Sequence, residues 1–262
     1  IADTINPHVS SSRITTFEVY APRYLLAEVN THGVIAKSAA SSRAIPVKKR
    51  IEMVCTKPYI PDAFGKNRPG MQSTELLNED DQLIAIGEWT SAIDHAVEHA
   101  RAFERMNVHK QYANRVLEPY VYYAGVLTAT EWDNFWWLRT NTDAAPGFQV
   151  LAQKMNEAYN ASIPKISHYH LPYISKEEFD TITDIDILMK VSSARCARVS
   201  YVSLETGKRT TIEEDMELIK KLTKSSGAHL SPFDHPARAD TISDKKWDNP
   251  TLHGRYWGWI PH

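Results

Sequence analysis

Hydrophobic residues recur at helical spacing in several stretches of this chain, and those stretches predict most of its helices. Within residues 88–108, one side of a helix collects Ile93, Ala96, Val97, Ala100 and Phe103. Residues 212–225 predict the best-marked amphipathic helix, acidic early and basic late, as the helix dipole favours. Two more helices are predicted over about 109–127 and 131–158, the second interrupted near Pro146.

Strands are predicted at two places. Residues 14–29 indicate a short strand, then Pro22 at a helix start, then a helix, and alternation in residues 194–201 predicts a second strand. Residues 30–46 are small and polar, a composition that suits a surface loop or close approach of the backbone to a ligand. Residues 58–80 and 164–172, rich in proline, predict breaks. Without repeats or a linker, residues 1–262 are expected to form one mixed, mostly helical domain.

Composition narrows the function classes. The 262 residues carry a formal net charge of -2, which argues against a general nucleic-acid clamp but allows a local basic pocket for one phosphate. No apolar run is long enough to span a membrane, and the polar amino end predicts no secretory leader. Two cysteines, Cys55 and Cys196, favour a reduced, cytoplasmic protein. The glycine-rich phosphate-binding loops of nucleotide-binding folds are missing from the sequence.

One sequence motif suggests a zinc hydrolase. His95-Ala-Val-Glu98-His99 spells HxxEH, in which two histidines one helical turn apart can share a metal. On the helix predicted here, however, His95 and His99 lie about 200° and 240° around the axis from Ile93, the centre of the apolar stripe, at 100° per residue. They therefore point toward a solvated face. No third ligand is assignable nearby, so the zinc hydrolase is a remote alternative. His168 and His170, between two prolines, are a similarly weak signal.

The segment around 131–139 has two possible interpretations. Trp132, Trp136 and Trp137 are expected to serve in core and interface packing, although a ligand platform is conceivable. Asn134 and Arg139 lie five residues apart on the same predicted helix. An arginine on an otherwise apolar helix needs an anionic or carbonyl partner, which either a bound nucleotide or a structural salt bridge supplies.

Three separated segments carry a common resemblance. The first runs from Phe17-Glu-Val-Tyr-Ala-Pro22 through His32 to Ser41-Ser42-Arg43, and the second is Asn134-Phe-Trp-Trp-Leu-Arg139. The third is Ala197-Arg-Val-Ser-Tyr201 followed by Gly227-Ala-His-Leu-Ser-Pro-Phe-Asp-His235. Together they resemble the flavin-dependent thymidylate synthase family, whose enzymes use folate and FAD to methylate dUMP. Most of that family has the third segment before the first, so this order resembles the circularly permuted, phage-type members.

The resemblance implies an α+β fold, in which long helices pack with a small, mainly antiparallel sheet, and a homotetramer with shared active sites. It also implies site residues by position. The expected nucleotide-binding residues are Glu28, Ser41, Ser42, Arg43, Arg115 and Arg139, of which Ser41 and Arg139 act on the pyrimidine ring. The expected FAD-binding residues are His32, Asn134, His229 and Ser231.

The chain departs from the family pattern mainly on the flavin side. Thr31 and Gly33 replace the two arginines that flank the motif histidine. Smaller residues also stand at other motif positions: Ala36, Ser38, Ala39, Ala145 and Gly147. The resemblance therefore implies binding of a pyrimidine nucleotide more directly than it implies ordinary flavin affinity.

The reaction implied is methylation at C5 of a uridine monophosphate, dUMP or UMP. Methylenetetrahydrofolate is the one-carbon donor, and FAD reduced by NADPH is the hydride source. No protein nucleophile is required: Ser41 positions the ring, Arg139 stabilises developing charge, and Arg43 with Arg115 clamps the phosphate. A non-catalytic or flavin-free pyrimidine-nucleotide-binding descendant is the main alternative. No nucleic-acid polymer and no membrane is expected as a partner.

Overall fold

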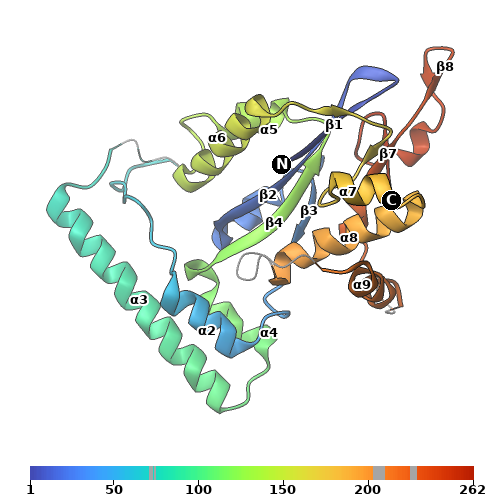
Figure 1. The fold of residues 1–262 in the computed structure, drawn as a ribbon. Helices are drawn as coiled ribbons and strands as arrows, with labels where there is room; N and C mark the ends of the chain where they lie inside the picture. The colour runs from blue at the N-terminus through green and yellow to red at the C-terminus, as the bar shows by residue number, and fades with distance from the viewer. Residues whose placement is uncertain (71–72, 74, 203–209, 225–228) are drawn as a thin grey trace.

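A five-stranded sheet, ordered β3-β4-β2-β1-β5, forms the centre of the computed structural model, which describes residues 1–70, 73, 75–202, 210–224 and 229–262 (Figure 1). Its strands are β1 (Ala2–Asn6), β2 (Val9–Pro22), β3 (Ala36–Ala39), β4 (Tyr122–Ala129) and β5 (Lys165–Ile166). All its pairings are antiparallel except that of β1 with β5. The predicted mixed class with a mainly antiparallel sheet is therefore confirmed.

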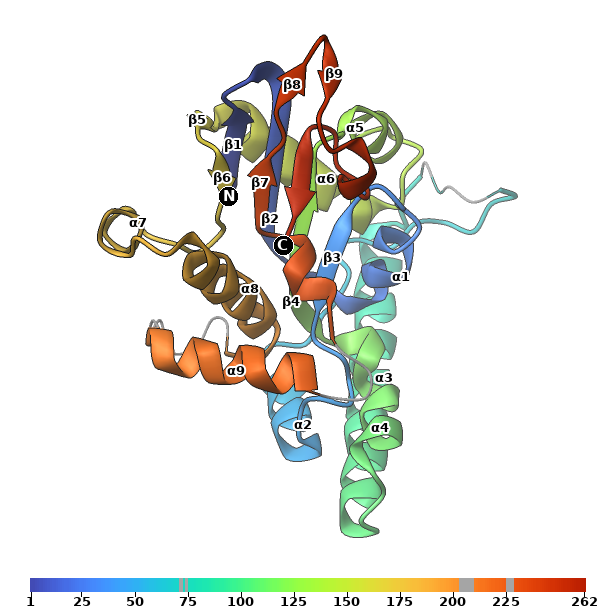
Figure 2. The ribbon, with the colours of Figure 1, turned by 90° about the vertical axis from the view of Figure 1, so that its right-hand side faces the viewer.

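Helices cover the two faces of this sheet, as Figures 1 and 2 show. On one face lie α5 (Asp133–Arg139) and α6 (Pro146–Ala161), packed on the sheet through Phe17, Leu127 and Phe148. On the other face lies α8 (Ile185–Val202), whose Cys196 packs against Val126. Because successive strand residues point to opposite faces, the neighbours Val126 and Leu127 of β4 serve the two cores separately.

A second helical unit lies beside one end of the sheet (Figure 2). It combines α2 (Val47–Thr56), α3 (Glu79–Arg105), α4 (Lys110–Ala113) and the 3-10 helix η2 (Asn114–Tyr120). Ile51, Val97 and Leu117 are buried together in its core. The predicted helix over 88–108 is confirmed but starts earlier, at Glu79, because Asn78 caps it and three acidic residues follow.

The remaining elements are short. A three-stranded sheet pairs β6 (Tyr169–His170), β7 (Ala237–Ala239) and β10 (Trp259–Pro261), and β8 (Ile242–Ser243) pairs with β9 (Lys246–Trp247). The other helices are η1 (Arg23–Leu25), α1 (Leu26–Val29), α7 (Lys176–Thr181), α9 (Ile212–Lys224), η3 (Ser231–Asp234) and η4 (Pro250–Leu252). Among the described residues, no helix has both the length and the apolar character needed to cross a membrane.

Two predicted elements are wrong. The helix predicted over 109–127 ends at Tyr120, and Tyr122–Ala129 is instead the strand β4, whose aromatic and β-branched residues pack well in a half-buried sheet. The strand predicted over 194–201 is part of helix α8. The alternating residues did not mark a polar face, since Arg195 in this segment is buried.

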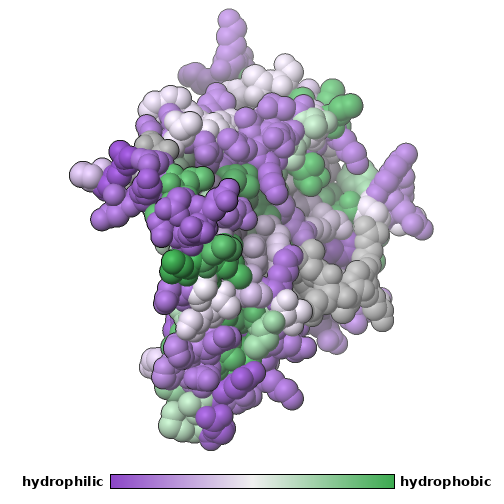
Figure 3. Space-filling model, turned by 90° about the vertical axis from the view of Figure 1, so that its left-hand side faces the viewer, coloured by the Kyte–Doolittle hydropathy of each residue, from purple (hydrophilic) through white to green (hydrophobic). Residues whose placement is uncertain are grey.

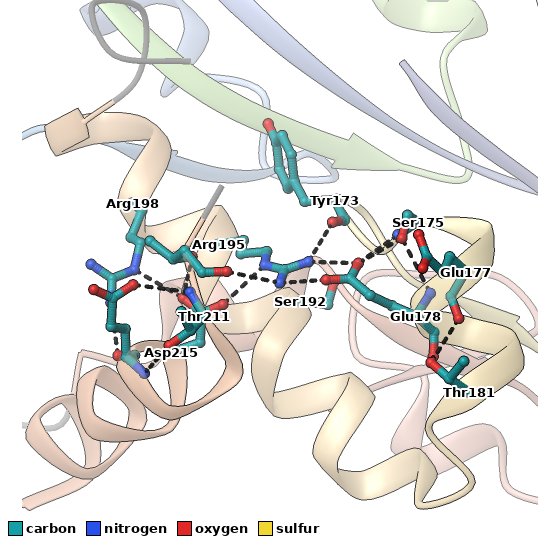
Figure 4. A network of polar contacts seen from close by, with 12 residues as sticks. Tyr173, Ser175, Glu177, Glu178, Thr181, Ser192, Arg195, Arg198, Thr211 and Asp215 are labelled. Atoms are coloured by element: carbon teal, nitrogen blue, oxygen red, sulfur yellow. Dashed lines mark hydrogen bonds and ion pairs between the residues drawn. The ribbon is translucent and has the colours of Figure 1, made fainter. Parts of the chain in front are cut away.

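Arg195 is the centre of an ionic network that joins three helices (Figure 4). Its guanidinium binds both carboxylate oxygens of Glu178 on α7, at 2.7 and 2.9 Å, and Asp215 on α9 at 2.9 Å. Asp215 is fully buried and also accepts a hydrogen bond from Arg198 at 3.0 Å. Glu178 is fixed by a capping box with Ser175 at the start of α7. The network fixes the positions of α7, α8 and α9 relative to one another.

We predict that Arg195→Met lowers the free energy of unfolding by about 3–5 kcal/mol, because it leaves buried carboxylate charge without its main partner. Urea unfolding followed by circular dichroism measures the change. Lys190→Met, which removes the exposed ion pair with Asp186 on the same helix, is the control and should cost no more than about 0.5 kcal/mol. Equal losses in the two variants would contradict the central role of Arg195.

Candidate functional site

Residues 28–43 pass three separate clusters of polar side chains. The first cluster surrounds Arg139, the last residue of α5, and the second surrounds Glu118 of η2. The third is a line of hydroxyl and imidazole groups that includes Ser38 on β3. Most of the residues predicted for substrate and cofactor binding belong to one of these clusters.

In the first cluster, Arg139 binds groups of its own chain. Its Nη1 donates to Glu28 at 3.1 Å and its Nε donates to Nε2 of His32 at 3.0 Å, while its guanidinium lies 4.5 Å from the ring centre of Phe148. Burial and the charge of Arg139 lower the pKa of His32 to about 4, so the imidazole is neutral and can accept this hydrogen bond. The salt-bridge interpretation of Arg139 is thus realised. Both members of the pair stay partly exposed to an approaching ligand.

The other residues predicted on α5 behave differently. Trp132 and Trp136 stack in the core, as expected, but Trp137 is 71% exposed. Asn134 is exposed as well, and none of the contacts of Arg139 within the described part of the chain involves it. The structure therefore brings Glu28, His32 and Arg139 together but leaves Asn134 apart from them.

The second cluster gathers three guanidinium groups near one carboxylate. Glu118 accepts hydrogen bonds from Arg23 at 3.3 Å, from Arg115 at 3.1 Å to each oxygen, and from the hydroxyl of Ser42. Arg50 on α2 lies close enough for the charges of Arg23 and Glu118 to act on it, and burial together with Arg23 lowers its pKa to about 10. Arg50 is only 1% exposed, and its Nε and Nη2 have no hydrogen-bond partner among the described residues.

Of the predicted substrate residues in this region, Ser42 is buried whereas Ser41 and Arg43 are exposed. The Asn114 amide holds the loop in place by donating to the carbonyls of Ser42 at 2.7 Å and Ile45 at 2.8 Å. This arrangement brings Ser42 and Arg115 to the same carboxylate and leaves the side chains of Ser41 and Arg43 on the surface beside it.

The sequence analysis missed Arg23, Arg50 and Glu118. A signal for Arg50 does exist, because position 50 belongs to the buried stripe of α2 together with Val47, Ile51 and Val54. A charged residue at an i, i+3, i+4, i+7 position of an apolar stripe indicates a buried charge that requires a partner. No comparable pattern marks Arg23 or Glu118, which meet only through the fold.

The third cluster is an unbroken line of hydrogen bonds across both sheets. Its links are Thr4 to His170 (2.8 Å), His170 to Thr16 (2.7 Å), Thr16 to Thr128 (2.6 Å), Thr128 to His235 (2.8 Å) and His235 to Ser38 (2.9 Å). Ser38 then donates to the hydroxyl of Ser231 at 3.4 Å, where the line reaches the surface. Each imidazole uses both ring nitrogens, so each is held in a fixed orientation.

The predicted FAD residues do not converge in one chain. Ser231 ends the third cluster and His229 is exposed beside it, His32 is buried against Arg139, and Asn134 is exposed on α5. Gly227, which belongs to the same motif as His229, lies outside the described residues. Gly147 stands where the family pattern has a glutamate, and a Cβ there would lie 2.4 Å from the hydroxyl of Tyr24. A larger residue at position 147 therefore requires Tyr24 to move.

The HxxEH motif lies on α3, and the predicted orientation of its histidines is confirmed: His95 and His99 are exposed and face away from Ile93 and Ala96. His170, by contrast, is buried and bound to two threonines. In the described part of the chain, no three His, Cys, Asp or Glu residues are grouped as metal ligands.

The chain matches no protein-family model and no curated protein. Among solved structures it is similar to the UMP/dUMP methylase PolB from Streptomyces cacaoi. The PolB complex with 5-Br UMP gives a TM-score of 0.49 and 20% identity, over 57% of this chain and 70% of PolB. The complex with 5-Br dUMP gives 0.46 and 22%, over 57% and 67%.

We predict that the third cluster makes stability depend on pH. Burial lowers the pKa of both His170 and His235 to about 3, from 6.5 in an unfolded chain. Between these values the unfolded chain binds protons that the folded chain does not, so stability should fall as pH drops below about 6.5. His170→Gln should reduce that slope by about 1 kcal/mol per pH unit between pH 6 and 5. Denaturant unfolding at stepped pH measures the slope, and identical slopes in the two proteins would contradict a neutral, buried His170.

Proposed function

We propose that the protein methylates C5 of a uridine monophosphate, with methylenetetrahydrofolate as the one-carbon donor and FAD reduced by NADPH as the hydride source. The observation that carries the proposal is that residues expected to bind the nucleotide or the cofactor, far apart in the chain, lie together in the fold. Glu28 and His32 lie against Arg139, and Ser42 lies against the carboxylate that Arg115 also binds. These residues are about 70 to 110 positions apart in the chain. Their proximity in the fold favours a common function.

The proposed roles follow from the chemistry of these groups. Arg139 donates to a pyrimidine oxygen and stabilises negative charge that develops on the ring, while neutral His32 and Glu28 keep its guanidinium oriented. Ser41, exposed on the loop, positions the ring without forming a bond to it. Arg43 and Arg115 reach the phosphate from the exposed side, where a planar guanidinium can donate two hydrogen bonds to oxygen atoms.

The residues present fit the nucleotide better than they fit a flavin. Where the family pattern has arginines, Thr31 donates to the backbone of Glu28, and Gly33 has no side chain. The neighbouring cations Lys37 and Arg255 donate to backbone carbonyls of residues 29–35. We therefore derive no reaction step through FAD. A flavin-free protein that binds a pyrimidine nucleotide is the second candidate, and the replaced flavin positions are the observation that favours it.

We further propose that the chain assembles as a homotetramer in the cytoplasm. Large hydrophobic side chains stay exposed on two helices: Trp137 and Leu138 on α5, and Leu83 and Ile84 on α3. On the face seen in Figure 3, hydrophobic residues form separate groups among hydrophilic ones. Apolar groups of this kind are commonly covered by other subunits.

The decisive prediction concerns tritium release. Supplied with FAD, NADPH and methylenetetrahydrofolate, the protein should release tritium from [5-³H]-dUMP or [5-³H]-UMP, because substitution at C5 expels that hydrogen. Arg139→Ala should slow release by about 10²–10³-fold, the usual cost of losing one oriented donor at developing charge. Ser41→Ala should weaken release without abolishing it, if the hydroxyl only positions the ring.

His95→Ala is the control for the zinc alternative and should leave release unchanged, because His95 is exposed on α3 away from all three clusters. Flavin titration of the same protein separates the two candidates. Binding of uridine nucleotide without flavin uptake or tritium release would favour the flavin-free protein. Absence of release from both nucleotides, in protein that has taken up flavin, would refute the methylase proposal.

A second prediction tests assembly. Light scattering at micromolar concentration should give four times the mass of one chain, and Trp137→Asp should shift the protein to smaller species. Because Trp137 is mostly exposed in one chain, the variant should keep the circular dichroism of the wild type. A monomer that releases tritium at the full rate would contradict the shared active site.

A further inference from the structure

The second cluster holds more positive than negative charge. Arg23, Arg50 and Arg115 are all cationic, and among the described residues Glu118 is the only carboxylate that contacts any of these guanidinium groups. Burying a guanidinium without a partner costs free energy that a nearby anion can offset. In the free protein, the cluster therefore lacks about one or two negative charges that would balance its guanidinium groups.

The exposed fraction of the side chain decreases from Arg115 to Glu118 to Arg50. The side chain of Arg115 is 56% exposed and that of Glu118 is 25% exposed. Arg50 is 1% exposed, and two of its donor atoms have no hydrogen-bond partner within the described residues. Glu118 is thus intermediate in exposure between Arg115 and the buried cation, and its charge acts on that cation. An anion that approaches past Arg115 meets the carboxylate of Glu118 first. This carboxylate occupies hydrogen-bond donors that the anion itself could use.

Glu118 uses donors of the kind that bind phosphate. One hydroxyl, from Ser42, and the guanidinium groups of Arg23 and Arg115 converge on its two oxygens. Hydroxyl and guanidinium donors placed in this way are typical of phosphate recognition. A phosphate monoester carries about 1.5 to 2 negative charges at pH 7, compared with one on a carboxylate, and so compensates the cluster more fully.

We propose that Glu118 is an internal stand-in for the ligand's phosphate: in the free protein it holds Arg23, Arg115 and Ser42, and a phosphate monoester displaces it. The displaced donors then bind phosphate oxygens, and the additional negative charge compensates buried Arg50. The inference rests on the proposed function, because the phosphate is taken to be that of the uridine nucleotide. Glu118 accordingly sets the affinity of the site by competition.

The test is calorimetric titration of UMP into the intact protein and into Glu118→Gln, a variant of nearly the same shape without the competing charge. The dissociation constant for UMP should decrease about tenfold in the variant, as expected when a like charge is removed from an anion site. Uridine, which lacks the phosphate, should bind both proteins equally. Glu52→Gln, an exposed charge change on α2, is the matched control and should alter UMP binding by less than twofold.

A second variant tests the buried cation. Without ligand, Arg50→Met should unfold at a higher temperature than wild type, because an uncompensated buried charge is lost. The rise in unfolding temperature caused by inorganic phosphate should be smaller in Arg50→Met than in wild type. A purely structural ion pair at Arg50 would give the reverse, a variant that is destabilised and responds normally to phosphate.

The inference is overturned if Glu118→Gln weakens UMP binding, since Glu118 then orients the arginines for the ligand and does not compete with it. It is also overturned if the variant binds FAD more tightly but UMP unchanged, since the anion would then belong to the cofactor. Both measurements are independent of catalysis. If Glu118→Gln binds UMP more tightly but the protein releases no tritium, only the methylase proposal is refuted.

Discussion

Two buried imidazole rings link the three-stranded sheet to the central five-stranded sheet, and one of them binds Ser38 in the segment 28–43 that carries many of the predicted site residues. His170 belongs to the three-stranded sheet and binds Thr4 and Thr16 of the central sheet. His235 precedes β7 and binds Thr128 of β4 and Ser38 of β3. Inside a protein, buried polar groups stabilise one arrangement only when all their partners are present, so the line of hydrogen bonds fixes how the sheets pack. His235 thereby bridges β3 and β4, which also pair through their backbones.

The contrast between the clusters is informative about function. In the line from Thr4 to Ser38, the hydroxyl and imidazole groups have near-ideal distances, as expected of a structural element. Around Glu118, by comparison, one carboxylate accepts from several donors, while two atoms of Arg50 have no partner in the part of the chain that the structure describes. The polar groups of the third cluster have hydrogen-bond partners, whereas some of those in the second cluster, near Glu118, have none among the described residues. A bound ligand would therefore stabilise the second cluster more than the third. The unsatisfied groups are thus the better guide to binding.

The departures from the flavin-dependent pattern have physical consequences in the surrounding structure. Without a side chain at Gly147, the Tyr24 hydroxyl comes close to α6 and lies 3.2 Å from that of Tyr59. Lys37 donates to the carbonyls of Val29 and His32, and so closes the turn before β3 on itself. Each of these contacts lies at or beside a position where the sequence departs from the family pattern.

The sequence by itself determined the amphipathic helices and the residues with distinctive chemistry. The stripe on α3, the dipole-matched helix α9 and the break at Pro146 depend on local spacing and on proline, which act within a few residues. Motif comparison likewise selected Glu28, His32 and Arg139, which the structure brings together. Local pattern failed for β4 and α8, since burial on both sides removes the polar face that distinguishes a strand from a helix. Only the tertiary structure decided that Arg139 has a partner in Glu28, that Arg50 lies buried near Glu118, and that two histidines join the sheets. Each of these depends on contacts between residues far apart in the chain, which no local spacing encodes.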